Sequence, residues 1–141
     1  MKSKLGAIFP ISSENVMPLF DNGKTIFVKY TKFKKLEKGS KIVFYVSKEK
    51  ILIGEGTVQK VETISPEIAW ARYGKEMFLN EMQYNRYVAK SPVSGRNREM
   101  EKITVFVLKN LTKYRNPVQW KHNITPSGCY LTREKHQRIR T

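Results

Sequence analysis

The sequence predicts an α+β domain whose short strands form a closed or partly closed barrel with short helices packed around it. Segments rich in β-branched and aromatic residues recur at short intervals, and the helix signals between them are short and do not alternate with the strands as βαβ units would. No repeat, linker or low-complexity tract divides the 141 residues. That length is typical of one domain, so we expect residues 1–141 to form a single domain.

The first third of the chain predicts two strands separated by a short helix. Residues 5–9 form an apolar segment, and residues 12–15 supply capping side chains for a helix that ends near a turn at 21–23. Pro18 limits the length of that helix, because its ring cannot follow the helical path. Residues 25–30 are β-branched and aromatic, which predicts the second strand.

A turn at residues 36–40 precedes two further strands. Residues 41–47 are apolar without alternation, which predicts a strand that is covered on both faces. Residues 51–64 predict a long strand that contains Gly54 and Gly56. Glycines two apart in a strand indicate a bulge, a barrel corner or backbone that packs closely against a neighbour.

Two helices are expected next. The first begins at Ser65 and Pro66, which have the residue types of an N-cap and a first helical position. This helix should end at Gly74, and residues 80–88 predict a second helix with helical spacing of apolar side chains. Residues 90–98 are polar, basic and rich in turn formers, which predicts an exposed loop.

The last part of the chain predicts one strand and one short helix. Residues 102–108 are the clearest late strand, and residues 116–117 and 125–128 are expected to form turns. Residues 132–139 predict a final helix that is capped by its threonine.

The charge of the chain favours an anionic partner. The chain has 27 Lys and Arg residues but only 12 Asp and Glu residues, which gives a net charge of +15. Such an excess of like charge opposes compaction and attracts nucleic acid, anionic membranes or phosphorylated small molecules. No apolar run approaches the roughly 20 residues of a spanning helix, and no signal peptide is evident, so we expect no membrane association.

The counts of cysteine and histidine exclude several site classes. One cysteine, Cys129, allows no internal disulfide, which fits a reducing cytoplasm. Two histidines and one cysteine disfavour a zinc site, and no phosphate-binding or dinucleotide-binding glycine motif is present. We therefore expect neither a metal nor a cofactor.

Basic residues alternate with aromatic residues near the C-terminus. Residues 109–140 contain eight Lys or Arg and one acid, with Tyr114, Trp120 and Tyr130 among them. Single-stranded RNA offers phosphates for the cations and unstacked bases for the rings. The alternative is that the rings belong to the core. For Tyr114 and Tyr130 a core position and a binding role are about equally compatible with the sequence. Trp120 lies near turns and is expected to be partly exposed. Trp70, in a predicted helix, is expected in the core or a cleft wall.

Catalytic candidates are few. Glu55 lies between two glycines and is the best-placed acid, although a carboxylate in a strand more simply pairs with a neighbouring lysine. Cys129, between Gly128 and Tyr130, is more typical of a small packed residue than of a nucleophile.

Three stretches together carry a family resemblance. They are the strand run that reads TIFVKY, LEKGSKIVFYVS and ILIGEGTVQKV, the Ser-Pro-Glu helix start at residue 65, and the closing ITPSGCYLTREKHQRI. The chain resembles the PUA-like superfamily, which includes the ASCH, EVE and YTH domains, and within it a family of small archaeal proteins of unknown function. The resemblance implies a PUA-like pseudo-barrel of mixed strands with short flanking helices, and RNA binding, often at modified bases.

Some ASCH relatives are hydrolases with the motif Gly-x-Lys-x-x-Glu-x-Arg. Set against this chain, the lysine falls on Lys24 and the arginine position holds Lys29, while the glycine is displaced to Gly23. The glutamate position holds Phe27, which cannot transfer a proton. The resemblance therefore implies that anion binding is retained and that the acid–base carboxylate is lost.

The leading interpretation is a domain that binds RNA in preference to DNA and recognises a modified or flipped-out base in a basic, aromatic-lined cleft. The alternative is an ASCH-type nucleoside or RNA hydrolase that uses Lys24 and Glu55 as catalytic residues. The residues expected to bind nucleic acid are Lys24, Lys29, Arg96, Arg98, Arg115, Trp120 and Lys121.

Overall fold

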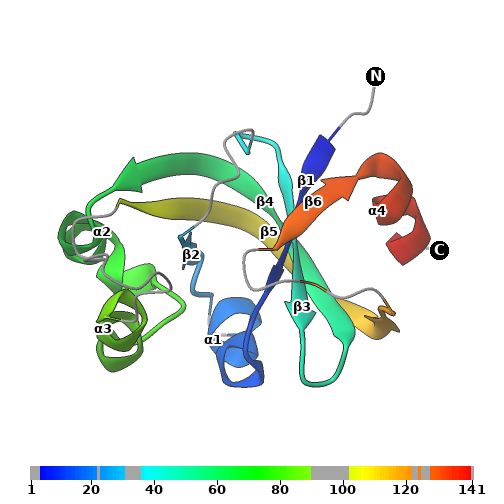
Figure 1. Cartoon of the computed structure of the whole chain (residues 1–141), viewed down its shortest axis with the longest axis horizontal. Helices are drawn as coiled ribbons and strands as arrows, with labels where there is room; N and C mark the ends of the chain where they lie inside the picture. Colours follow the sequence, from blue (N-terminus) through cyan, green and yellow to red (C-terminus); the bar gives the residue numbers. More distant parts are fainter. Residues whose placement is uncertain are drawn as a thin grey trace.

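The computed structural model describes residues 4–21, 23–30, 36–89, 102–121, 124 and 128–140. Their strands form a six-stranded sheet in the order β2-β5-β4-β3-β1-β6 (Figure 1). The strands are β1 (Lys4–Pro10), β2 (Ile26–Lys29), β3 (Lys41–Val46), β4 (Ile51–Ile64), β5 (Ile103–Gln119) and β6 (Cys129–Thr132).

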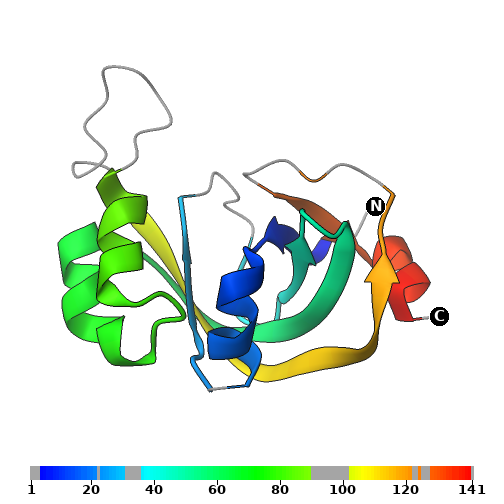
Figure 2. The ribbon, with the colours of Figure 1, turned by 90° about the horizontal axis from the view of Figure 1, so that it is seen from below.

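The sheet is mixed and strongly curled. β1 and β3 are parallel, whereas the other neighbouring strands are antiparallel. The long strands β4 and β5 pair from one end of the molecule to the other, with three register shifts along them, and they bend beneath the remaining elements (Figure 2). Within the described residues β2 and β6 remain the two edges of the sheet, so the barrel is partly closed. The predicted α+β architecture, a partly closed barrel of mixed strands with short flanking helices, is confirmed.

Short helices cover the two ends of this curled sheet. The helices α2 (Pro66–Tyr73) and α3 (Glu81–Ala89) lie together at one end, α4 (Arg133–Arg140) lies at the other, and α1 (Val16–Phe20) lies between them (Figure 1). The 3₁₀ turns η1 (Ser13–Asn15) and η2 (Gly74–Glu76) precede α1 and follow α2. In the part of the chain that the structure describes, no helix is long and apolar enough to cross a membrane.

The buried side chains form two clusters. The larger cluster lies between the sheet and α1 to α3 and has Phe27 at its centre. The ring centroid of Phe27 lies 5.1 Å from that of Phe44 and 4.9 Å from that of Phe78. The smaller cluster lies beneath α4 and contains Trp120, Leu131 and Ile139 among others.

Gly54 behaves as its spacing in the strand predicts. A Cβ at this position would lie 2.5 Å from the carbonyl oxygen of Thr112 and 2.7 Å from the ring of Phe20. The register of β4 against both neighbouring strands shifts beside this residue. The glycine therefore marks both a bulge and a close approach of two backbones.

One predicted turn is wrong, and one strand was not predicted. Asn116 and Pro117 lie inside β5, where the register against β4 shifts between Leu52 and Gly54. Four residues of β5, 114–117, stand there opposite one residue of β4, so the proline needs no ladder hydrogen bond. The strand β6 pairs with β1, more than a hundred residues away, which no local pattern reveals.

Candidate functional site

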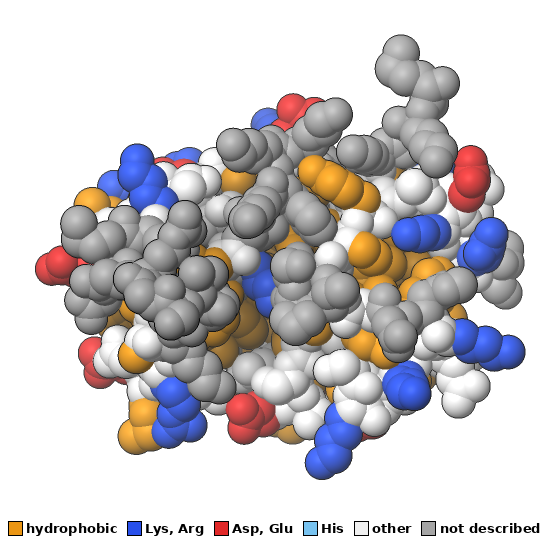
Figure 3. Space-filling model, in the orientation of Figure 1, with side chains coloured by type: hydrophobic (Ala, Val, Ile, Leu, Met, Phe, Trp, Pro, Cys, Tyr) orange, Lys and Arg blue, Asp and Glu red, His pale blue; other side chains and the backbone are white. Residues whose placement is uncertain are grey.

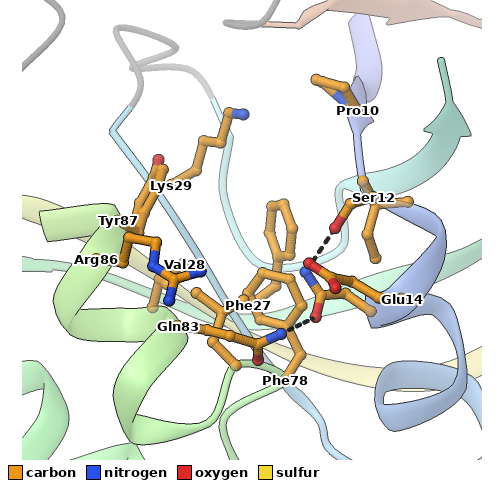
Figure 4. A pocket seen from close by; sticks show the side chains of 13 residues that line it. Pro10, Ser12, Glu14, Phe27, Val28, Lys29, Phe78, Gln83, Arg86 and Tyr87 are labelled. Carbon is orange, nitrogen blue, oxygen red and sulfur yellow. Dashed lines mark hydrogen bonds between the residues drawn. The ribbon is translucent and has the colours of Figure 1, made fainter. Parts of the chain in front are cut away.

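The candidate site is a cavity of about 270 Å³ between the end of β1, η1, β2 and α3 (Figure 4). Its apolar surface comes from Phe27 and Val28 of β2 together with Phe78 and Leu79, which lead into α3. These side chains are at least nine-tenths buried, so the cavity stands on the main core and its wall is rigid. The volume is close to the lower end of the range for small-molecule sites, which suits a single base or nucleoside.

A chain of hydrogen bonds crosses the cavity. The amide of Gln83 on α3 donates from Nε2 to Oδ1 of Asn15 at 3.2 Å. Asn15 in turn donates from Nδ2 to Oγ of Ser12 at 2.8 Å. Asn15 is only 7% exposed, and a buried amide with both groups bonded holds a single orientation (Figure 4).

Charged side chains stand at the mouth of the cavity. Lys29 from β2 and Arg86 from α3 extend from one side, and Glu14 extends from the opposite side (Figure 4). Tyr87 also lines the cavity, and its hydroxyl accepts a hydrogen bond from the backbone N–H of Tyr30 at 3.0 Å. The site thus combines an aromatic wall, amide hydrogen-bonding groups and two cations, which can hold a planar base and its phosphate.

Of the residues predicted to bind nucleic acid, Lys29 lines this cavity and Lys24 is not among its lining residues. The amine of Lys24 donates instead to the carbonyl oxygen of Lys75 at 2.6 Å. Arg115 is exposed on β5. The predicted residues Arg96 and Arg98 lie outside the described residues, so their role stays a prediction.

The expected partial exposure of Trp120 is wrong. This side chain is 7% exposed and belongs to the smaller core cluster, because β5 continues to Gln119 and carries the ring inward. Trp120 and Lys121 together line a separate cavity of about 340 Å³. Trp70 forms a cleft wall, as predicted: it borders a cavity of about 500 Å³, and its ring centroid lies 5.1 Å from that of Tyr84.

Glu55 lies in a second polar cluster at the other end of the molecule. Its carboxylate accepts a hydrogen bond from the hydroxyl of Tyr114 at 2.8 Å and contacts Nε2 of His136 at 3.0 Å. The amine of Lys41 lies 3.9 Å away and donates to Oγ1 of Thr57 at 2.8 Å. The predicted pairing of Glu55 with a neighbouring lysine is therefore present, and the neighbours of Glu55 differ from those of Lys24.

The two catalytic candidates Glu55 and Cys129 both have shifted pKa values. Burial alone would raise the pKa of Glu55, but the hydrogen bonds from His136 and Tyr114, with the charges of His136 and Lys41, outweigh it, so the pKa lies below its ordinary value. Burial raises the pKa of the Cys129 thiol, which opposes a nucleophilic thiolate. Among the residues that the structure describes, no group of three His, Cys, Asp or Glu side chains is arranged to hold a metal ion.

Sequence reasoning missed most of the cavity. Ser12, Asn15, Gln83 and Arg86 come from two segments about 70 residues apart, and only folding brings them together. The sequence predicts that Ser12 and Asn15 cap a helix. Helix capping by itself explains these residue types, so they gave no sign of a binding site. The one available signal was the Asn80–Gln83 spacing, which is typical of a helix start rather than of a binding site.

Comparisons with known proteins agree with this architecture. An uncharacterized protein of Methanocaldococcus jannaschii, MJECS03, is 30% identical over 104 residues, which span 70% of this chain and 95% of that protein. Crystal structures of ASCH from Zymomonas mobilis and of a mutant of it superpose with TM-scores of 0.76 and 0.77 at 23% and 22% identity. They cover 97% and 99% of this chain and 94% and 96% of theirs, and at this identity they show the fold alone.

The sequence pattern described as "Domain of unknown function (DUF365)" matches residues 4–133, nearly the whole chain. This match shows the family of the protein, and the superposition shows that its curled mixed sheet has the fold of ASCH. The chain belongs to the DUF365 family and has the fold of ASCH.

Proposed function

We propose that residues 1–141 act as one RNA-binding domain that takes a single modified or flipped-out base into the cavity between β2 and α3. The observation that carries the proposal is the combination within one cavity of an aromatic wall, an ordered amide chain and the cations Lys29 and Arg86. A base removed from its stack needs a flat apolar surface and hydrogen bonds to its edge, and its backbone needs positive charge nearby.

The charge of the chain supports a polyanionic partner. The net charge is +15, and Figure 3 shows lysine and arginine side chains spread across one face, around hydrophobic side chains exposed near its middle. Cations distributed in this way can follow a phosphate backbone on either side of a bound base. The RNA-binding theme of the PUA-like superfamily favours RNA over DNA.

The test is the affinity of the purified protein for a short single-stranded RNA and for the DNA of the same sequence, measured by fluorescence anisotropy. Arg86→Gln is expected to weaken RNA binding about tenfold, since a charge-assisted hydrogen bond contributes roughly 1.5–3 kcal/mol. Arg72→Gln is the matched control, because it also removes one exposed arginine from a helix. Arg72 pairs with Glu62 and is not among the residues that line the cavity. Equal losses in the two variants would assign binding to charge alone, and absent RNA binding by the wild type would refute the proposal.

A second candidate function, an ASCH-type nucleoside or RNA hydrolase, is favoured by one observation. Glu14 places a carboxylate at the mouth of the cavity, opposite Lys29 and Arg86 (Figure 4). An acid in reach of a bound substrate can serve as a general base, which Phe27 cannot. Turnover of acylated nucleosides or RNA that is lost in Glu14→Gln would establish this function; loss in Lys24→Ala and Glu55→Gln would instead assign catalysis to that pair.

A further inference from the structure

A second cavity lies beside α3, away from the candidate site. It has a volume of about 500 Å³ and is lined by the start of α2 and by α3. Gln83, Arg86 and Tyr87 of α3 line the candidate site, whereas Tyr84 and Val88 of the same helix line this second cavity. Different side chains of α3 therefore serve two cavities, and the proposed function makes no use of the second.

The wall of the second cavity is apolar and held in place by a buried hydrogen bond. The ring centroids of Trp70 and Tyr84 lie 5.1 Å apart, and Tyr84 is 2% exposed. The hydroxyl of Tyr84 donates to the carbonyl oxygen of Pro66, which ties α3 to α2. Burial raises the pKa of Tyr84, so this hydroxyl stays protonated and keeps donating. The volume falls within the range of small-molecule sites, so the cavity can enclose the apolar body of a small ligand.

The charge that faces this cavity is negative. Glu67 is an exposed lining residue, and no hydrogen bond or ion pair of its carboxylate falls within the described residues. Asn85 adds an uncharged amide. The described lining residues include no lysine or arginine, although the chain contains 27 of them. A cationic ligand would therefore find an opposite charge here that no described side chain already neutralises.

The start of α2 offers little to an anion. A helix N-terminus binds anions through its free N–H groups. Pro66 has no N–H, the N–H of Ile68 donates to Oγ of Ser65, and the N–H of Ala69 donates to the carbonyl oxygen of Ser65. Among the first four residues of the helix this leaves the N–H of Glu67. The carboxylate of Glu67, rather than the backbone, therefore sets the charge preference of the cavity.

We propose that the second cavity binds a small organic amine, with the ammonium group paired with Glu67 and the apolar body packed against Trp70 and Val88. The carboxylate supplies the opposite charge, and the wall gains from burial of an apolar body, which a hydrated inorganic cation lacks. The same arrangement disfavours RNA, because phosphates would meet Glu67 with no described cation beside it. This ligand class does not depend on the proposed function.

The experiment titrates the protein at neutral pH with compounds of similar size and different charge: 2-phenylethylamine, 2-phenylethanol and 3-phenylpropanoate. The chain has two tryptophans, whose indole N–H signals in a ¹⁵N–¹H NMR spectrum are assigned with Trp120→Phe. The Trp70 signal is expected to shift, while that of Trp120, in the smaller core cluster, stays in place. The amine should bind about fivefold more tightly than the alcohol, the ratio that a favourable exposed ion pair gives, and the acid should bind most weakly.

Two pairs of variants assign the ammonium group to Glu67. Glu67→Gln should make the amine and the alcohol bind equally, whereas Glu81→Gln, at an exposed acid in the first turn of α3 that does not line the cavity, should keep the preference. Ala89→Lys places a cation at the cavity and should weaken binding of the amine severalfold. Ala71→Lys is its control, because this exposed alanine borders a different cavity together with Trp70.

Several results would overturn the proposal. They are equal binding of the compounds, a preference for the acid, and a Trp70 signal that does not move at millimolar concentrations. A preference for the amine that survives Glu67→Gln would show that other groups hold the ammonium. An equal loss in Ala71→Lys and Ala89→Lys would assign binding to the other cavity. None of these outcomes bears on RNA binding, which is measured separately.

Discussion

Phe27 shows how one buried residue forms the wall of the candidate site. The family resemblance aligns it with a glutamate of the hydrolase motif, and it is 2% exposed in the main core. Its ring packs against Phe9, Phe44, Phe78 and Phe106. A carboxylate here would lie among aromatic rings without a partner, whereas the phenylalanine ring stabilises the wall of the cavity.

Glu55 is a residue whose contribution should depend on pH. Its pKa is lowered in the folded state, so its stabilising effect is complete above the unfolded pKa of roughly 4.3 and is lost as the pH falls through the folded value. Glu55→Gln should therefore reduce the free energy of unfolding by about 1–3 kcal/mol at neutral pH. Urea titrations of both proteins should show this difference shrinking as the pH falls below about 4.

The control for this measurement is Glu49→Gln, in the exposed turn between β3 and β4. Its stability should follow that of the wild type at each pH, because no hydrogen bond or ion pair of Glu49 falls within the described residues. A difference between Glu55→Gln and the wild type that stays constant down to pH 2 would contradict an ionised, hydrogen-bonded Glu55.

The helix α3 is the element on which the candidate site depends most. Its first turn is closed by two hydrogen bonds, from the N–H of Gln83 to Oδ1 of Asn80 and from the N–H of Asn80 to Oε1 of Gln83. The same glutamine then reaches Asn15 across the cavity. One side chain thus begins a helix and orients a ligand site, which couples the geometry of the site to helix formation.

The helix α2 provides a test of the local signals at the element scale. Oγ of Ser65 accepts a hydrogen bond from the N–H of Ile68 at 3.3 Å, and Pro66 follows at the first position. Ser65→Ala should lower the free energy of unfolding by about 1 kcal/mol, because an orphan N–H loses its partner. Ser47→Ala, at an exposed turn position, should change it by less than about 0.5 kcal/mol in the same thermal denaturation series. Equal effects would contradict the cap.

At the scale of the whole molecule, charge determines how binding responds to salt. With a net charge of +15, a protein that neutralises three or four phosphates of single-stranded RNA should give a slope of roughly −2 to −3 for log K against log salt concentration. A titration between 50 and 300 mM salt measures this slope. Arg86→Gln should reduce its magnitude by about 0.7 if Arg86 contacts a phosphate. An affinity that is independent of salt would contradict an electrostatic contribution.

The sequence alone determined the elements that rest on local signals. The Ser65–Pro66 helix start, the strands at residues 41–47 and 51–64 and the bulge at Gly54 follow from capping, β-branched runs and glycine placement, and the structure contains each of them. The family resemblance likewise led to the correct fold. Such signals act over a few residues, so they can be read without knowledge of the rest of the chain.

Only the tertiary structure decided where the chemistry lies. Asn15 of η1 and Gln83 of α3 are 68 residues apart and meet because both elements line the same cavity, while Glu55 meets His136 because α4 docks at the opposite end. Trp120 is buried because β5 continues through Pro117 at a register shift with β4. Each of these contacts depends on long-range packing or strand pairing, which is set by the whole core rather than by neighbours in sequence.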